Sequence, residues 1–189
     1  RYLSATARVF SVRPLPALLA TLRAQGASAM EAVMLDLYAA GPHTAWPAGG
    51  RDLLDRCIHY DPPRTVAPPV LLDRNRMHVP PALRRLWVGG VRERVFGVAP
   101  WLTKYPLLRP AAGALPAPDN PHYCAGGRVA NVTGVLRHYK FHAGFAQQCA
   151  QAVASGVYAG ASREYEAYLT GLRRDGALDL HGPASRTDA

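Results

Sequence analysis

Residues 29–38 read AMEAVMLDLY, a nearly continuous apolar run that is followed by the turn residues Gly41-Pro42. A run of this length between turns is typical of a strand buried on both faces, as in a parallel or mixed sheet. Residues 14–26 have leucines at helical spacing and end at a glycine, which predicts a helix. Residues 8–12 (RVFSV) can supply a strand before that helix. The order strand, helix, strand indicates βαβ winding and an α/β fold.

Three further segments are predicted to be extended: residues 91–96, 101–108 and 134–141. In the first, VRERVF, strand alternation places Arg92 and Arg94 on the same face. In the last, GVLRHYKF, it places His138 and Lys140 on the same face. Each pair would then present two polar side chains in one direction.

The C-terminal part of the chain is predicted to be helical. Phe145 is followed by apolar residues at the spacing of one helix face, and a last helix begins near Ser162 and ends at Gly176. We therefore expect a single α/β domain over residues 1–180 with two C-terminal helices, and a disordered polar tail at residues 181–189.

Two stretches, residues 41–82 and residues 110–121, are predicted to be long loops. The first contains three Pro-Pro pairs, which exclude regular helix and favour extended segments. The chain holds 17 glycines and 17 prolines, which also favours long connections between short elements. A stretch this long without regular structure is usually functional or packs against something else.

The composition limits the class of protein. Of the 189 residues 49% are hydrophobic, so a sizeable core is expected and wholesale disorder is excluded. No apolar run approaches the roughly 20 residues that span a bilayer, so no transmembrane segment is expected. The three cysteines lie far apart and form no CxxC pair, which indicates neither a zinc site nor a disulfide framework. Reduced thiols of this kind favour a cytoplasmic location.

The chain is basic, with a formal net charge of +9 from 22 basic and 13 acidic residues. A basic surface attracts polyanions such as nucleic acid, acidic lipid or a phosphorylated small molecule. The arginines are scattered and are not interleaved with aromatic residues, so nucleic-acid binding is not expected. Peripheral association with an acidic membrane surface stays open.

Three groups of residues could carry chemistry. Arg92 and Arg94, about 7 Å apart by strand rise, could clamp a diphosphate, although a solvated edge strand gives the same pattern. His138 and Lys140 could bind a metal and a phosphate, although a core histidine is the plainer interpretation. Lys104 lies in an apolar extended segment and must reach solvent or an anion. The sequence contains no GxGxxG, P-loop, HExxH, GxSxG or DxD motif.

Several segments, taken in order, resemble the carboxy-terminal portion of bacterial glycosyltransferase family 2 proteins. They are residues 27–42, 86–97, 102–108 and 136–141, with His122 in its loop and the tyrosine-containing region 158–169. The most specific motifs are VGGVRERVFG, LTKYPL and LRHYKF. The resemblance covers roughly residues 9–180. It implies a partial GT-A (Rossmann-like) mixed sheet with long Pro-rich loops and two C-terminal helices. It also implies transfer of a sugar from a nucleotide-sugar donor to a glycan or glycoconjugate acceptor.

The same resemblance implies a set of site residues. His138 becomes the candidate ligand of a divalent cation, Mn²⁺ or Mg²⁺, that neutralises the diphosphate leaving group. Candidate contacts to the diphosphate or the acceptor are Arg92, Arg94, Lys104, His122 and Lys140.

One departure from the family pattern concerns the acids that hold the cation. The family carries a DxD-like motif before the position of Arg13, but residues 5–12 (ATARVFSV) contain no carboxylate. We therefore expect a truncated or degenerate member, and little or no transferase activity in the isolated chain. A non-catalytic carbohydrate- or phosphate-binding module on the same scaffold is the alternative.

Overall fold

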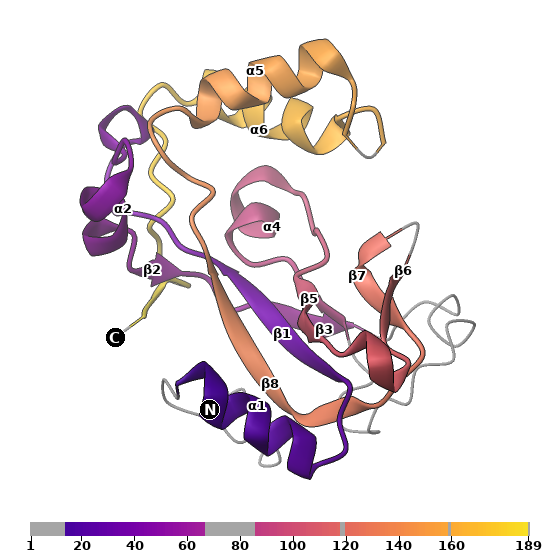
Figure 1. Ribbon diagram of the computed structural model, residues 1–189. Helices are drawn as coiled ribbons and strands as arrows, with labels where there is room; N and C mark the ends of the chain where they lie inside the picture. Colours follow the sequence, from indigo (N-terminus) through magenta and orange to yellow (C-terminus); the bar gives the residue numbers. More distant parts are fainter. Residues whose placement is uncertain (1–13, 67–85, 118–119, 159, 189) are drawn as a thin grey trace. The chain divides into compact units, whose positions relative to one another are not determined.

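The computed structural model describes residues 14–66, 86–117, 120–158 and 160–188. Their elements are α1 (Leu15–Ala24), β1 (Ala29–Asp36), η1 (His43–Ala45), α2 (Gly50–Arg56), β2 (His59–Tyr60), β3 (Arg64–Val66), β4 (Leu86–Val88), α4 (Val91–Phe96), β5 (Thr103–Leu108), η3 (Pro110–Ala112), β6 (Leu115–Ala117), β7 (Asn120–Ala125), β8 (Val129–His138), α5 (Phe145–Ser155), α6 (Arg163–Arg174) and β9 (Arg186–Thr187). This mixture of helices and strands confirms the α/β class (Figure 1).

The chain divides into two compact units. Among the described residues, the first unit is drawn from 14–34, 65–66, 86–88, 101–117 and 120–136. The second is drawn from Leu35–Arg64, Gly89–Pro100 and Arg137–Ala189, and it includes the C-terminal ends of β1 and β8.

A mixed three-stranded sheet has the strand order β5-β1-β8, with the apolar run 29–38 supplying its central strand. β5 is antiparallel to β1, with Ala29 opposite Leu108. β8 is parallel to β1, because the Ser28 N–H donates to the Arg128 carbonyl and the Leu37 N–H donates to the His138 carbonyl. The predictions of strands around 29–38, 101–108 and 134–141 are thus confirmed, whereas the predicted strand 8–12 lies outside the described residues.

The first unit has its core around β1. The predicted first helix is present as α1, and its Leu22 packs with Met30 of β1 and Val132 of β8. A second group of small apolar residues includes Ala29 and Val129. Gly134 allows a close approach, because a Cβ there would lie 2.8 Å from the Met30 methyl group.

The second unit has an aromatic core below its two C-terminal helices. Phe141, Phe145 of α5 and Tyr168 of α6 are fully buried, with ring centroids 5.1 Å apart for the first two. α5 and α6 lie side by side, and α4 contacts α6 (Figure 1). The prediction of two C-terminal helices is therefore confirmed. α6 follows Ser162 as predicted, but the Ser162 side chain makes no capping bond, and its hydroxyl is buried without a hydrogen-bond partner in the described chain.

Residues 91–96 form a helix, α4, and the predicted strand at this position is wrong. Val91 and Val95 are four residues apart, a spacing that fits both strand alternation and one helix face. Gly97 ends the helix in the left-handed conformation with φ 68°, the usual glycine stop. On a helix, residues two apart point in nearly opposite directions, so Arg92 and Arg94 do not share a face.

The predicted loops and tail also contain regular structure. Residues 41–66 include η1, α2, β2 and β3, and residues 67–82 lie outside the described residues. Residues 110–121 include η3, β6 and the start of β7. The structure differs from the disordered tail predicted at 181–189, because β9 pairs with β2 and brings Tyr60 opposite Arg186. This pairing gives the backbone of the polar tail hydrogen-bond partners that the composition of the tail does not reveal.

The packing of α4 against α6 leaves no room for a side chain at one glycine of α6. A Cβ on the buried Gly171 would lie 2.7 Å from Cδ1 of Phe96. The Phe96 ring is itself held against Tyr168, with centroids 5.0 Å apart. Gly171→Ala is therefore expected to lower the free energy of unfolding by about 1–3 kcal/mol, even though alanine favours helix by about 1 kcal/mol.

Urea unfolding followed by circular dichroism measures this loss. Gly176→Ala is the matched control, since nothing lies within 4 Å of a Cβ there, and it should leave stability nearly unchanged. A Gly171→Ala protein as stable as the control would contradict the packing described here.

Within the described part of the chain, none of the helices combines the length and the apolar character needed to cross a lipid bilayer.

Candidate functional site

Five charged or polar side chains meet inside the second unit, and we call them the Arg92 cluster. They are Asp36, Arg92, His138, Lys140 and Glu164. Asp36 and His138 end β1 and β8, Arg92 lies in α4, Lys140 follows β8, and Glu164 lies in the first turn of α6. Three of these five residues, Arg92, His138 and Lys140, are among the residues predicted from the sequence.

The parallel pairing of β1 and β8 explains why Asp36 and His138 meet. Parallel strands bring their carboxyl ends to the same edge of a sheet, where ligand sites of α/β folds usually lie. Here the His138 Nδ1 lies 2.6 Å from Asp36 Oδ1, and the Asp36 side chain is only 2% exposed. The buried carboxylate therefore fixes the orientation of the imidazole.

Arg92 forms the buried centre of the cluster, with a side chain 5% exposed. Its Nε donates to Asp36 Oδ2 at 2.6 Å and its Nη1 donates to Glu164 Oε1 at 2.9 Å. Burial disfavours the guanidinium charge, yet Asp36, Tyr168 and Glu164 outweigh it and raise the pKa of Arg92 above its ordinary value. Two carboxylates thus pair with the Arg92 guanidinium, which was predicted to contact a diphosphate.

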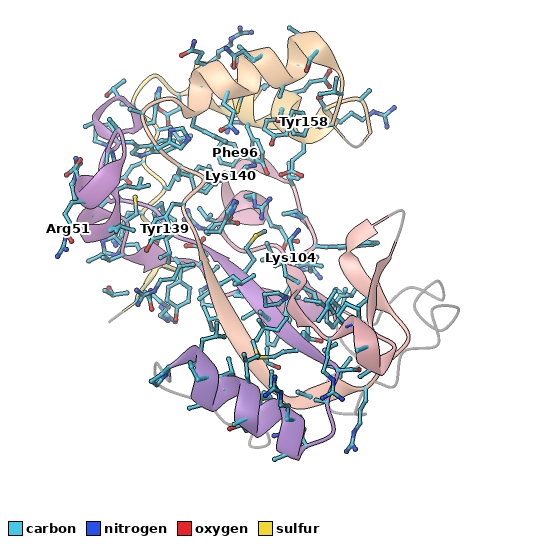
Figure 2. All side chains as sticks on the ribbon, viewed as in Figure 1. Arg51, Phe96, Lys104, Tyr139, Lys140 and Tyr158 are labelled. Carbon is cyan, nitrogen blue, oxygen red and sulfur yellow. The ribbon has the colours of Figure 1, made fainter. Side chains whose placement is uncertain are left out.

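Lys140, which is labelled in Figure 2, is held between an acid and aromatic rings. Its Nζ lies 3.9 Å from Glu164 Oε1 and 4.7 Å from the centre of the Tyr165 ring. The side chain is 10% exposed. Burial, and then the charge of Arg92, lower the pKa of Lys140. Tyr168 donates a further hydrogen bond to Glu164, so this carboxylate receives partners from three side chains.

His138 is the member of the cluster with the most exposed side chain, at 38%, followed by Glu164 at 32%. Because Nδ1 faces Asp36, Nε2 is the ring nitrogen that remains for a ligand. A neutral Nε2 can accept a proton or a hydrogen bond, and a protonated one can donate to an anion. The cluster therefore presents one oriented imidazole next to charged side chains that are paired with one another.

The described residues do not fit a resident divalent cation at this place. No group of three or more His, Cys, Asp or Glu side chains with suitable geometry occurs in the ranges that the structure describes. Both oxygens of Asp36 are already engaged, by His138 and by Arg92. His138 thus offers a single nitrogen, and one imidazole binds Mg²⁺ or Mn²⁺ poorly. We derive no step through a metal ion.

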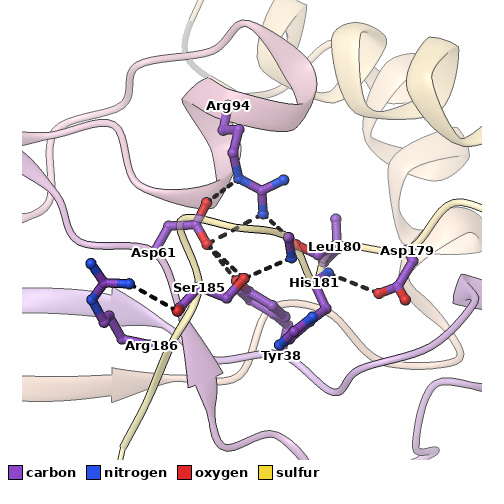
Figure 3. Close-up of polar contacts among 9 residues, drawn as sticks. Tyr38, Asp61, Arg94, Asp179, Leu180, His181, Ser185 and Arg186 are labelled. Carbon is purple, nitrogen blue, oxygen red and sulfur yellow. Dashed lines mark hydrogen bonds and ion pairs between the residues drawn. The ribbon is translucent and has the colours of Figure 1, made fainter.

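Arg94 belongs to a second polar network of the same unit (Figure 3). It donates to the Asp61 carboxylate and to the Leu180 carbonyl. Tyr38 also donates to Asp61, and its hydroxyl lies 2.7 Å from the Ser185 hydroxyl. Burial and the neighbouring carboxylate raise the pKa of Tyr38 above its ordinary value. The helical form of residues 91–96 therefore sends Arg92 and Arg94 to two separate networks.

The remaining predicted residues lie in the first unit. Lys104 is half-buried in β5, opposite Ala32 of β1. His122 lies in β7, and its side chain is outside those that the structure describes. Of the predicted site residues, Arg92, His138 and Lys140 therefore meet in the Arg92 cluster, Arg94 lies in another network of the same unit, and Lys104 and His122 belong to the first unit.

Sequence reasoning missed the two acids that organise the cluster, Asp36 and Glu164. A usable signal for Asp36 existed, since it ends a predicted buried strand, and His138 lies near the end of another. Glu164 is 72 residues from Arg92 in the sequence and carried no such signal, because a glutamate in the first turn of a helix is ordinary.

Comparisons with protein-family models, with curated proteins and with solved structures found no match to this chain.

Proposed function

We propose that this chain is part of a glycosyltransferase that moves a sugar from a nucleotide-sugar donor to a glycan or glycoconjugate acceptor. The observation that carries the proposal is the half-exposed His138 imidazole, held by buried Asp36 at the carboxyl ends of two parallel strands. Support also comes from the sequence motifs, since VGGVRERVFG and LRHYKF supply Arg92, His138 and Lys140 to one cluster.

Glycosyl transfer requires mainly that the imidazole of His138 is held in one orientation. In glycosyl transfer the acceptor oxygen bonds to the anomeric carbon, the nucleoside diphosphate leaves with the electron pair of the bond that breaks, and the acceptor hydroxyl gives its proton to a base. An oriented Nε2 can hydrogen-bond to that hydroxyl or to a diphosphate oxygen. Arg92, Lys140 and Glu164 act as positioning residues, because their charges are satisfied mainly by one another. The divalent cation implied by the resemblance would need ligands from outside the Arg92 cluster.

Nucleotide-sugar binding tests this proposal. The protein is titrated with UDP-glucose, UDP-galactose and GDP-mannose, with and without Mn²⁺, and the His138 ring signals are followed by NMR. We expect saturable shifts of those signals with at least one donor. His138→Ala should weaken that binding by about 10-fold, the effect of one lost hydrogen bond to a charged group.

The control variant is His181→Ala, which removes an exposed imidazole of the same unit and should leave the affinity unchanged. A folded wild-type protein that binds none of the donors, nor UDP or GDP, would contradict the proposal. Release of free sugar is measured in the same samples and is expected to be negligible. Substantial hydrolysis or transfer would overturn that expectation, and binding without turnover in the presence of an acceptor would favour the non-catalytic module.

A further inference from the structure

The second unit also has an open, concave site that is lined by none of the five residues of the Arg92 cluster. Its volume is about 210 Å³, and the side chains that line it include Asp61, Pro62, Arg64, Glu93, Arg94 and Ala184. We call it the Arg94 pocket. These residues come from the loop around β2 and β3, from α4 and from the segment before β9, so three separate parts of the chain build it.

Two ion pairs give the pocket its charged lining. Arg94 pairs with Asp61, whose side chain is 4% exposed. Arg64 pairs with Glu93 through Nη2 at 2.8 Å and Nε at 3.0 Å. The Arg64 hydrogen bond lowers the pKa of Glu93, which keeps this carboxylate ionised at neutral pH. Two arginines and two acids therefore leave the lining with no formal net charge.

Hydrogen bonds link the residues on the buried side of the pocket. Asp61 accepts hydrogen bonds from Tyr38 and Arg94, and Ser185 lies against both Tyr38 and Asp61 (Figure 3). Gly182 donates its N–H to the Ser185 hydroxyl, so the segment that carries Ala184 is fixed as well. Side chains that are already held by hydrogen bonds before binding lose less entropy when a ligand binds.

The two guanidinium groups keep unused donors. Among the described residues, the hydrogen bonds of Arg94 and of Arg64 use Nε and Nη2, so the Nη1 groups remain for a ligand. Glu93 keeps carboxylate lone pairs beyond those that Arg64 occupies. Pro62 and Ala184 add apolar contact surface. The pocket thus offers donors, an acceptor and an apolar wall within a small space.

We propose that the Arg94 pocket binds one neutral sugar ring, whose hydroxyl groups meet Arg64, Arg94 and Glu93 while its C–H face lies on Pro62 and Ala184. A sugar hydroxyl both donates and accepts, which matches a lining of paired cations and anions. A phosphate gains little from a lining without net charge, because each arginine already has its carboxylate. The volume is below the 300–1,000 Å³ typical of drug-sized ligands, which suits a single ring better than a nucleotide. That this sugar belongs to the acceptor rests on the proposed function; the binding itself does not.

Titration with methyl glycosides tests the pocket directly. Methyl α-D-glucopyranoside, galactopyranoside and mannopyranoside are added to the protein, and saturation-transfer NMR and amide shifts are recorded. We expect millimolar dissociation constants for at least one of them, with shifts at Glu93, Arg94 and Ala184. Inorganic phosphate should bind at least 10-fold more weakly.

Three variants separate this site from chance binding. Ala184→Trp should fill the pocket and abolish glycoside binding, whereas Ala154→Trp, at an exposed alanine of α5, should have no effect. Glu93→Gln leaves the shape unchanged but gives the lining a net positive charge. It should weaken glycoside binding several-fold and raise the affinity for phosphate by a similar factor.

Three results would overturn the proposal: no saturable binding of any glycoside, phosphate binding as tight as glycoside binding in the wild type, or equal effects of the two tryptophan variants. The test is independent of the donor experiment. Glycoside binding that persists in His138→Ala, in a protein that binds no nucleotide sugar, would support the pocket and refute the proposed function. Donor binding without glycoside binding would do the reverse.

Discussion

Replacing Arg92 with methionine is expected to lower the free energy of unfolding by about 3–5 kcal/mol. The substitution keeps much of the side-chain volume but removes the partner of Asp36, whose side chain is 2% exposed. The carboxylate would then stay buried with His138 as its remaining partner, and Glu164 would lose its bond from Nη1. Leaving one buried charge unpaired is far more destabilising than removing a pair together.

Urea unfolding at neutral pH measures this loss, and two further variants show where it comes from. Arg51→Met breaks an ion pair with Asp55 in which both side chains are largely exposed, and it should change stability by less than about 1 kcal/mol. The double variant Arg92→Met/Asp36→Asn removes both charges and should regain part of the loss. Equal losses in the Arg92 and Arg51 variants would show that the buried pair does not stabilise the unit.

The long elements of this fold could be predicted from the sequence, because their patterns extend over two or more turns or over a whole strand. The apolar run 29–38 became β1, and the alternation at 134–141 became the end of β8. α4 could not be distinguished in this way, since six residues with Val91 and Val95 four apart fit a strand and a helix equally well. The glycine at position 97, which ends the helix, was the local signal that pointed the other way.

Only the part of the candidate site that lies at the ends of two strands could be predicted from the sequence. His138 was predicted because strand alternation places it on the same face as Lys140 and because of the family resemblance, whereas its partner Asp36 is 102 residues away in the sequence. Local patterns do not encode which strands are neighbours, so Asp36 could be paired with His138 only when the parallel order of β1 and β8 was known. The same limit applies to the Arg94 pocket, which joins three distant segments of the chain.

Glu31 is expected to make the stability of the protein fall as the pH rises from about 5 to 8. Its side chain lies in β1 in the first unit, and the residue is 2% exposed. Burial raises the pKa of Glu31 from 4.5 to about 8, and a hydrogen bond from the Trp87 side chain opposes this rise only in part. The native carboxyl is therefore protonated at neutral pH, whereas the carboxyl of the unfolded chain is ionised.

The sign of the effect follows from the protons bound in each state. Between pH 4.5 and about 8 the native state holds a proton that the unfolded chain has released, so each unit of pH lowers the free energy of unfolding by about 1.4 kcal/mol. The loss across the window is on the order of 5 kcal/mol, and it is complete above the native pKa. Below pH 4.5 both states hold the proton and Glu31 contributes no slope.

Glu31→Gln isolates this contribution, because glutamine has nearly the same shape and no charge to bury. Urea unfolding at pH 5, 6, 7, 8 and 9 should give similar stabilities for the two proteins at pH 5 and a growing advantage for Glu31→Gln toward pH 8. Other groups titrate in both proteins, so the difference between the two curves reports Glu31 alone. Glu166→Gln, at an exposed glutamate of α6, should follow the wild-type curve at every pH. Parallel curves for wild type and Glu31→Gln would mean that this carboxyl ionises normally despite its burial.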